Sequence, residues 1–180
     1  MTGSDRSLLA AIGNGDRHAL EQVYLTHKDD LLTAAMYLLR ERNLAEDALH
    51  DVFVALPPRA SKLALRGSLK GYLMASCVNR ARDMLRTQAR QPIERALVGE
   101  RVSGSIQPPE AVELEERRQQ LVSAVACLPI EQREVLTLHI HGQLTFPDVA
   151  EQLDIPLNTA QSRYRYALVA LRRLLQVEDG

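Results

Sequence analysis

Tryptophan is absent from this chain of 180 residues, and all aromatic residues together make up only 4% of it. Cysteine is scarce as well: Cys77 and Cys127 are far apart, and both fall on helix faces that the spacing predicts to be apolar. A free cysteine in such a place usually behaves as a small hydrophobic residue. We therefore expect no disulfide, no metal site and no cofactor.

Long apolar runs are also lacking. None approaches the roughly 20 residues needed to cross a bilayer, and the first residues show no apolar signal core behind a basic head. We therefore expect a cytoplasmic protein with no membrane insertion. Apolar residues at 46% and charged residues at 25% are typical of a folded globular protein and exclude a disordered chain.

Signatures of catalysis are a third absence. The sequence has no glycine-rich phosphate loop, no H-E-x-x-H motif and no cysteine within a nucleophile pattern. His139 and His141 are two residues apart, so they point to different helix faces, and no further cluster of metal ligands lies near them. We expect surface or helix-cap roles for both histidines and no enzymatic activity.

The spacing of the apolar residues predicts helices throughout. Nearly all recur at steps of three and four, and no stretch alternates apolar and polar residues over the length of a half-buried strand. The fold class is therefore predicted to be all-α. The first long helix is expected after the turn at 13–15, with Asp16 as its N-cap. Its apolar stripe consists of Leu20, Val23, Tyr24, Leu31, Ala35 and Leu39.

Two further helices complete the first part of the chain. Asn43, with Glu46 three residues later, predicts a capped helix start, and Pro57-Pro58 ends this helix. A longer helix is expected from about Ser68 to Arg90. The residues predicted to face inward are Leu49, Val52 and Phe53 in the shorter helix, and Leu69, Tyr72, Leu73, Cys77, Met84 and Leu85 in the longer one.

Residues 91–109 contain prolines, glycines and serines and few residues that could anchor a core. They predict a flexible linker between two small helical domains, residues 1–90 and 110–180. In the second domain a helix is expected from Glu110 to Cys127, followed by a break at Leu128-Pro129. The next helix is expected to end at Gly142 in a left-handed conformation.

Charge is segregated along the chain, although the net charge is only −1. Residues 59–90 contain eight basic residues and one acidic residue, Asp83. Residues 157–176 contain four arginines and no acidic residue. Because binding to phosphates depends on local basic faces, these two segments are candidates for contact with a polyanion.

Residues 145–175 have the pattern of a helix-turn-helix. Thr145-Phe-Pro-Asp148 predicts a capping box at the start of a helix that reaches Leu153. Residues 154–156 are only long enough for a turn. Asn158 with Gln161 is a second capping signal, which opens a basic helix that runs to about Leu175.

The start of this second helix carries side chains suited to DNA. Those that can bond base edges are Asn158, Gln161, Ser162 and Arg165, and those that can reach phosphates are Arg163, Arg172 and Arg173. A C-terminal helical hairpin whose arginines are only solvated has the same pattern. This segment alone leaves both interpretations open.

Four segments match the pattern of one family in the correct order. They are Ala45-Glu46-Asp47 with Asp51-Val52-Phe53; Gly71-Tyr72-Leu73 through Asn79 to Asp83-Met84-Leu85-Arg86; Leu128-Pro129 with Gln132-Arg133-Glu134-Val135-Leu136; and Gly142 through Arg163, with Ile155, Thr159, Ser162 and Arg163 in place. On these residues the chain resembles the extracytoplasmic-function (ECF) sigma factors of the sigma-70 superfamily, from about Ala19 to Leu175.

The resemblance implies a sigma factor that binds core RNA polymerase and directs promoter recognition and transcription initiation. It implies that double-stranded promoter DNA is bound at the −35 element by Asn158, Thr159, Gln161, Ser162, Arg163 and Arg165. At the −10 element it implies Lys70, Asn79, Arg80, Arg82 and Arg86. For docking on core polymerase, at the β′ subunit, it implies Glu46, Asp47, Asp51, Val52 and Phe53. An anti-sigma factor is a further implied partner.

The sequence departs from the family pattern at three places. Pro57 and Tyr72 stand where tryptophan is common, and Gln161 stands where a basic residue is usual. These departures bear on promoter sequence and melting. Two other functions remain open from the residues: a stand-alone helix-turn-helix transcriptional regulator, and a sigma-like adaptor that binds only proteins. DNA binding that depends on polymerase distinguishes a sigma factor from the stand-alone regulator, and loss of DNA binding identifies the adaptor.

Overall fold

The computed structural model describes residues 3–63, 65, 67–90 and 109–175, with side chains described from residue 4 onward except for 109–115 and 118. These residues form helices and no strand, which confirms the predicted all-α fold. The N-terminal helices are α1 (Gly3–Gly13), α2 (Arg17–Leu39), α3 (Arg42–Ala55), α4 (Pro57–Ala60) and α5 (Leu69–Arg90). The C-terminal helices are α6 (Pro109–Ala126), α7 (Ile130–Leu136), the π-helical turn η1 (Thr137–His141), α8 (Phe146–Leu153) and α9 (Leu157–Leu174).

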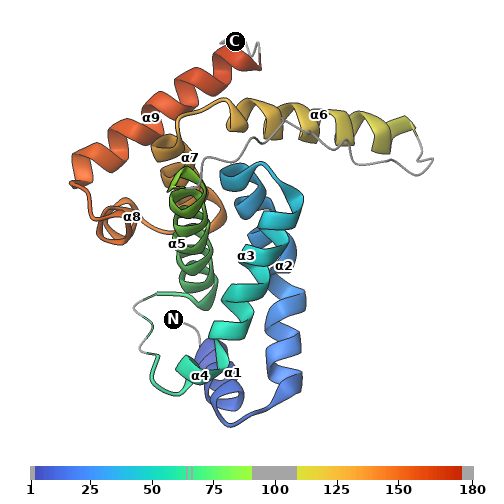
Figure 1. Cartoon of the computed structure of the whole chain (residues 1–180), viewed down its shortest axis with the longest axis vertical. Coiled ribbons are helices and arrows are strands. Elements are labelled where there is room, and N and C mark those ends of the chain that lie inside the picture. Colours follow the sequence, from blue (N-terminus) through green and yellow to red (C-terminus); the bar gives the residue numbers. More distant parts are fainter. Residues whose placement is uncertain (1–2, 64, 66, 91–108, 176–180) are drawn as a thin grey trace.

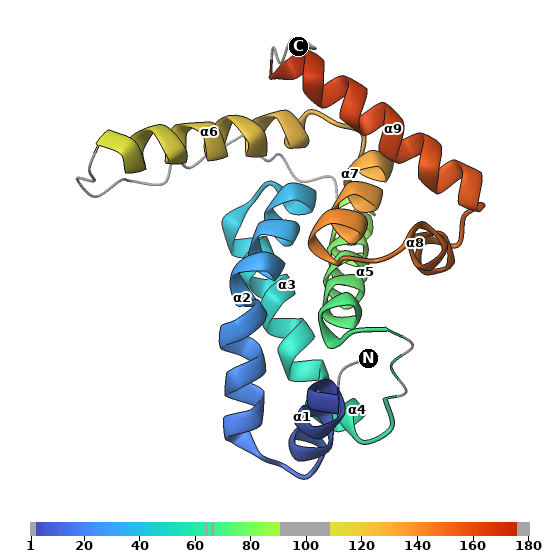
Figure 2. The ribbon, with the colours of Figure 1, turned by 180° about the vertical axis from the view of Figure 1, so that it is seen from behind.

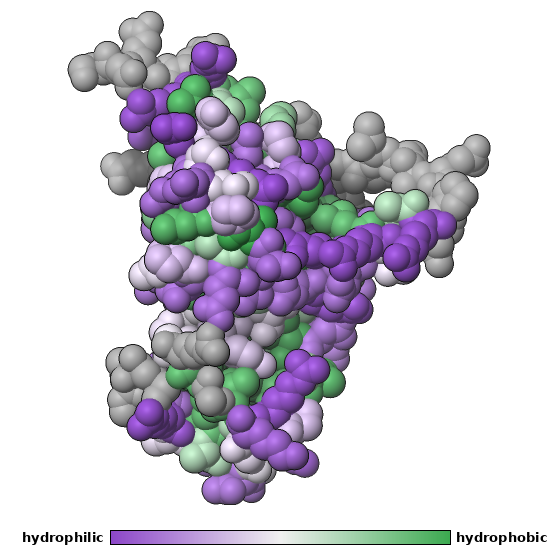
Figure 3. Space-filling model, turned by 90° about the vertical axis from the view of Figure 1, so that its left-hand side faces the viewer, coloured by the Kyte–Doolittle hydropathy of each residue, from purple (hydrophilic) through white to green (hydrophobic). Residues whose placement is uncertain are grey.

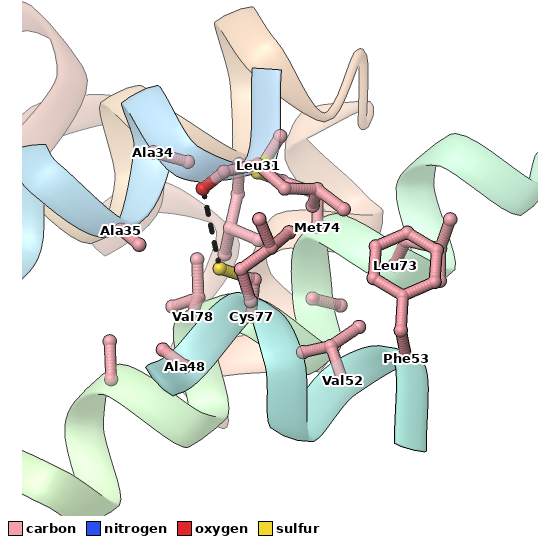
Figure 4. Packing of buried hydrophobic residues seen from close by; sticks show 14 of the residues in the cluster. Leu31, Ala34, Ala35, Ala48, Val52, Phe53, Leu73, Met74, Cys77 and Val78 are labelled. Atoms are coloured by element: carbon pink, nitrogen blue, oxygen red, sulfur yellow. Dashed lines mark hydrogen bonds between the residues drawn. The ribbon is translucent and has the colours of Figure 1, made fainter. Parts of the chain in front are cut away.

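The helices α2, α3 and α5 form the body of the N-terminal part, and the short α1 and α4 pack together at its lower end (Figure 1). Their facing sides are apolar, as the spacing predicted, and Leu31, Leu73 and Met74 are almost completely buried. The Cys77 thiol lies in the middle of this core, where it donates a hydrogen bond to the Leu31 carbonyl oxygen at 3.6 Å (Figure 4). Tyr24 departs from the predicted stripe, because its side chain is exposed at the edge of the core.

The ends of these helices follow local chemistry with one exception. The Asp16 carboxylate accepts hydrogen bonds from the His18 and Ala19 amides, as predicted for the N-cap of α2. Asn43, however, does not cap α3. The helix begins at Arg42, because the Glu41 carbonyl already accepts the first intrahelical bond, and the helix carries no side-chain cap there.

The C-terminal helices confirm the predicted break at Leu128-Pro129 and the end of α8 at Leu153. The expectation for Gly142 was wrong: its φ is −77°, and the following residue, Gln143, takes the left-handed conformation with a φ of 54°. Glycine is needed at position 142 because there is no room for a Cβ atom. A Cβ there would lie 2.5 Å from the Leu138 carbonyl oxygen and 3.0 Å from Cγ of Met74 in α5.

The two parts of the chain share a core. Val135 and Leu138, together with residues of α8 and α9, belong to the same buried apolar cluster as the facing sides of α2, α3 and α5. The helix α7 contacts α2, and η1 contacts both α5 and α2. Figures 1 and 2 show α7 at the upper end of α5 in two opposite views. The predicted linker, residues 91–109, lies outside the described residues except for Pro109, which begins α6. None of the described helices is long and apolar enough to cross a membrane.

Candidate nucleic-acid interface

The helices α8 and α9 form the predicted helix-turn-helix. Thr145 and Asp148 make the reciprocal bonds of a capping box at the start of α8. The helix ends where Asp154 adopts a left-handed conformation with a φ of 53°, and Pro156 leads directly into α9. Ala150 and Ala160 are buried between the two helices, and their small side chains allow the close approach that fixes the angle.

Six predicted DNA-binding residues lie within the first nine residues of α9, about two and a half turns. Asn158, Gln161 and Arg165 are exposed, and Thr159, Ser162 and Arg163 are half-buried. The predicted capping role of Asn158 was wrong: Pro156 is the N-cap, and its carbonyl accepts the Thr159 and Ala160 amides. Asn158 is therefore a residue of the first helical turn, and its amide group is not used as a cap.

The order of these side chains along α9 suits a helix that inserts its first turns into a groove. The Arg165 guanidinium lies over the ring of Tyr166, 5.5 Å from its centre, which directs the cation along the exposed face. Arg172 and Arg173 are exposed in the last turn, farther from the turn between the helices. Figure 3 shows that the side of the molecule that carries α8 and the start of α9 is mainly hydrophilic.

An aromatic cluster that the sequence did not predict holds α9 in place. His139 of η1 stacks on Phe146 at 4.2 Å, and Tyr164 of α9 meets both rings edge-on. The His139 Nδ1 atom lies 2.7 Å from the Leu144 carbonyl oxygen. His139 is therefore a packing residue and not the surface or cap residue that was expected.

The basic face of α5 carries the residues predicted for the −10 element, and most are paired with acids. Lys70 bonds Asp30 at 2.6 Å, and Arg80 bonds Asp51 at 2.6 Å. The remaining three differ in their surroundings: Asn79 is exposed, Arg86 is exposed and 3.7 Å from a carboxylate oxygen of Asp83, and Arg82 forms a two-point bond with Glu134 of α7.

The acidic face of α3 carries the residues predicted for polymerase docking. Glu46 and Asp47 are exposed, and Asp51 is half-buried beside Arg80. Val52 and Phe53 lie behind them in the core, where Phe53 meets the Tyr24 ring at 5.0 Å. These two apolar residues therefore support the acidic face from within and do not form part of its surface.

Comparisons with known proteins agree with this geometry. The family models described as Sigma-70 region 2 and Sigma-70, region 4 match residues 23–91 and 118–171. The ECF RNA polymerase sigma factor SigK of Mycobacterium tuberculosis (strain H37Rv) is 25% identical over 189 residues, which cover 98% of this chain and 100% of SigK. The sigma factor SigM of the same strain is 29% identical and covers 96% of this chain and 85% of SigM. The chain belongs to the ECF sigma factors of the sigma-70 family.

This sigma factor directs promoter recognition and transcription initiation with RNA polymerase. Solved structures share its fold. CnrH, determined in complex with the cytosolic domain of CnrY, matches with a TM-score of 0.66 and 23% identity over 97% of this chain and 99% of CnrH. The sigma factor RpoE of Bartonella quintana, determined with the anti-sigma factor NepR, matches with a TM-score of 0.67 and 22% identity over 88% of this chain and 98% of RpoE.

The titratable groups of the sigma factor reflect the contact between its two parts. The hydrogen bonds that Arg82 donates to the Glu134 carboxylate raise the pKa of Arg82. Burial lowers the pKa of His141, whose ring lies 5.4 Å from that of Tyr37 in α2. His141 therefore packs between the two parts, contrary to its expected surface or cap role. In the described residues, no group of three or more histidine, cysteine or acidic side chains could hold a metal ion.

Proposed function

We propose that the exposed first turns of α9 read the −35 element and that the basic face of α5 contacts the −10 element. The observation that carries this proposal is the arrangement of α9: Asn158, Gln161 and Arg165 are exposed at its start, and α8 and the aromatic cluster of His139, Phe146 and Tyr164 support it from behind. Amide and guanidinium groups at the start of a recognition helix can bond base edges in the major groove. This supports direct reading of sequence.

On α5, the proposed contacts are Lys70, Asn79, Arg80, Arg82 and Arg86. Four of these side chains are cations, so they supply sequence-independent attraction to phosphates, and an amide can bond a base edge or a flipped base. The carboxylates of Asp30 and Asp51 hold the long side chains of Lys70 and Arg80 in place. We propose that DNA phosphates compete with these carboxylates when the promoter binds.

Docking on the polymerase is proposed for α3. Glu46 and Asp47 are exposed, and Glu46 accepts a hydrogen bond from Arg42 Nε at 2.8 Å. We propose that both carboxylates meet a basic surface on the β′ subunit. Residues 1–90 and 110–180 act as the two DNA-reading domains, and residues 91–109 connect them. A sigma factor of this kind works by binding and not by catalysis, and we place it in the cytoplasm with the polymerase and the chromosome.

We also propose that an anti-sigma factor regulates the chain. The support comes from the two similar folds: RpoE was determined with an anti-sigma factor, and CnrH with the cytosolic domain of CnrY. Such a partner would have to cover DNA- or polymerase-binding surfaces that are exposed here.

The reading of the −35 element is tested by transcription from a random promoter library with two variants. Arg165→Ala should cost about 1–3 kcal/mol of promoter-specific binding if the guanidinium meets a base, and it should relax the selected −35 sequence at one position. Arg173→Ala, in the last turn of the same helix, should weaken binding to all promoters alike and lower the salt dependence. Equal small losses from both variants, with an unchanged selected sequence, would refute this placement of the reading face.

A further inference from the structure

The N-terminal part of the chain exposes few large apolar side chains. Among its described residues there are three: Tyr24 at 38% exposure, Leu25 at 56% and Val54 at 59%. Single exposed apolar residues are normal on a protein surface, so exposure alone assigns no role to any of them. Their positions, however, separate them into one pair and one isolated residue.

Tyr24 and Val54 lie at the contact between α2 and α3, which run side by side (Figure 1). The ring of Tyr24 meets that of Phe53 edge-on, with the centres 5.0 Å apart, and Val54 is the next residue after Phe53. Phe53 itself is only 7% exposed. The two exposed side chains therefore border the same buried ring from two different helices.

Val54 shares the outer face of α3 with the carboxylates. Asp47, His50 and Val54 follow one another at steps of three and four, which places them on one face of the helix. All three are exposed, and so is Glu46, four residues before His50. The acidic face of α3 therefore continues into an apolar side chain near the end of the helix.

Leu25 lies on a different side of α2. Successive residues of a helix point about 100° apart, so Leu25 turns away from α3 where Tyr24 turns toward it. Leu25 lies in a shallow hollow, and the other residues that line this hollow all belong to α2: His18, Glu21, Gln22 and Thr26. Leu25 is thus an exposed apolar residue of the same part of the chain that does not border the acidic face.

An acidic face alone is a weak docking surface. Exposed carboxylates attract a basic partner from a distance, but solvent and salt screen them, so they contribute little affinity after contact. Affinity in protein interfaces is concentrated in a few apolar or aromatic side chains inside a polar rim, and tyrosine is frequent among them. Val52 and Phe53 are buried and cannot supply this contact. Tyr24 and Val54 are exposed beside the carboxylates and can.

We propose that Tyr24 and Val54 form the apolar centre of the surface that docks on core RNA polymerase, with Glu46 and Asp47 as its acidic rim. The proposal rests on the proposed function, in which α3 meets a basic surface of the polymerase, and it adds a residue of α2 to that surface. The charge of the rim identifies the occupant: carboxylates repel DNA phosphates and attract lysine and arginine, whose hydrocarbon stems can cover the apolar centre.

Docking can be measured as separate association and dissociation rates, with purified bacterial core polymerase immobilised and the full chain in solution. Val54→Gln should raise the dissociation rate about tenfold, because it removes an apolar contact that forms only after the partners have met. Tyr24→Gln should act in the same way. Asp47→Asn should instead lower the association rate and flatten its dependence on salt, because a charge in the rim acts at long range.

Two variants on the side of α2 that faces away from α3 are matched controls. Leu25→Gln removes an apolar side chain about as exposed as Val54, and it should keep the wild-type dissociation rate. Asp29→Asn removes an exposed carboxylate four residues after Leu25, and it should change the association rate much less than Asp47→Asn. Val54→Ile retains an apolar side chain and should dissociate as slowly as wild type. Circular dichroism verifies the folding of each variant.

Equal dissociation rates for Val54→Gln and wild type would overturn the apolar centre. If Asp47→Asn still slows association in that case, the proposed docking of α3 stands. Wild-type rates for both variants would overturn the docking surface as a whole. The result that the proposal requires is faster dissociation of Val54→Gln, without the same effect in Leu25→Gln or Val54→Ile.

Discussion

Gly142→Ala is the substitution whose effect the structure defines most narrowly. The φ of −77° at this position suits alanine, so backbone strain does not enter. The added Cβ would lie 2.5 Å from the Leu138 carbonyl oxygen and 3.0 and 3.2 Å from Cγ and Cβ of Met74. The carbonyl belongs to the main chain of η1 itself and cannot rotate away, so the end of η1 must change its backbone conformation, and the Met74 side chain of α5 must shift as well.

The expected cost follows from two opposing terms. Overpacking of an interior costs about 1–3 kcal/mol. Replacing glycine by alanine at a compatible φ also lowers the conformational entropy of the unfolded chain, which stabilises the folded protein by about 0.4–1 kcal/mol. We therefore expect Gly142→Ala to lower the free energy of unfolding by about 1–2 kcal/mol. For a chain of this length that lowers Tm by about 2–8 °C.

The assay is urea denaturation followed by circular dichroism, with a matched glycine as control. Gly67→Ala places its Cβ in open space at an ordinary φ, so it should leave stability unchanged or slightly raised. Met74→Ala destabilises the protein by itself because this side chain is buried, but Gly142→Ala should cost less in the Met74→Ala background than in wild type, because Cγ of Met74 is then absent. A Gly142→Ala protein as stable as wild type would refute the close packing of Leu138 and Met74 around position 142.

Three further outcomes are expected. Thr145→Ala should destabilise the protein by about 1 kcal/mol in urea denaturation because it removes the capping box of α8, whereas Thr145→Ser should retain most of that stability; equal losses would contradict the cap. Burial lowers the pKa of His27 and His141 below the ordinary 6.5, so the unfolded chain binds more protons; this contribution to stability is complete above pH 6.5 and should be lost as the pH falls below it, and denaturation midpoints that are higher in acid would contradict it. A thiol reagent should modify Cys127 rapidly in the native protein and Cys77 only after unfolding, and equal rates would contradict the burial of Cys77.

Local chemistry made most helix boundaries predictable from the sequence. Asp16, the capping box that begins at Thr145, and the prolines at 57 and 129 act on the residues next to them, and the structure places helix starts and breaks there. Asn43 and Asn158 failed as caps for a local reason too. In both places the carbonyl two residues earlier already starts the helix, which puts the asparagine inside the first turn.

Contacts between distant segments could not be predicted in this way. Arg133 and Glu134 were recognised only as part of a motif, because their partners lie in α2 and α5 and no spacing rule connects them. His139 and His141 were expected at the surface, since a histidine gives no sign of whether an aromatic ring from elsewhere will cover it. The prediction for Cys127 failed in the opposite way. It was expected on an apolar helix face, but it follows the last turn of α6 and is exposed.

The candidate site was predictable where it follows from one helix and unpredictable where it spans two. The exposure of Asn158, Gln161 and Arg165 results from the periodicity of α9 alone. The bond between Arg80 and Asp51, by contrast, joins the helix proposed to bind DNA to the helix proposed to bind polymerase. It could not have been inferred before α3 and α5 were known to be neighbours.

The most direct test of the central claim is run-off transcription from a random promoter library by purified bacterial core polymerase, with and without this protein. The account predicts initiation that depends on the protein and selects a discrete set of promoters with two separated sequence elements. If the protein neither binds core polymerase nor changes which templates are transcribed, the assignment of its surfaces to promoter recognition is contradicted.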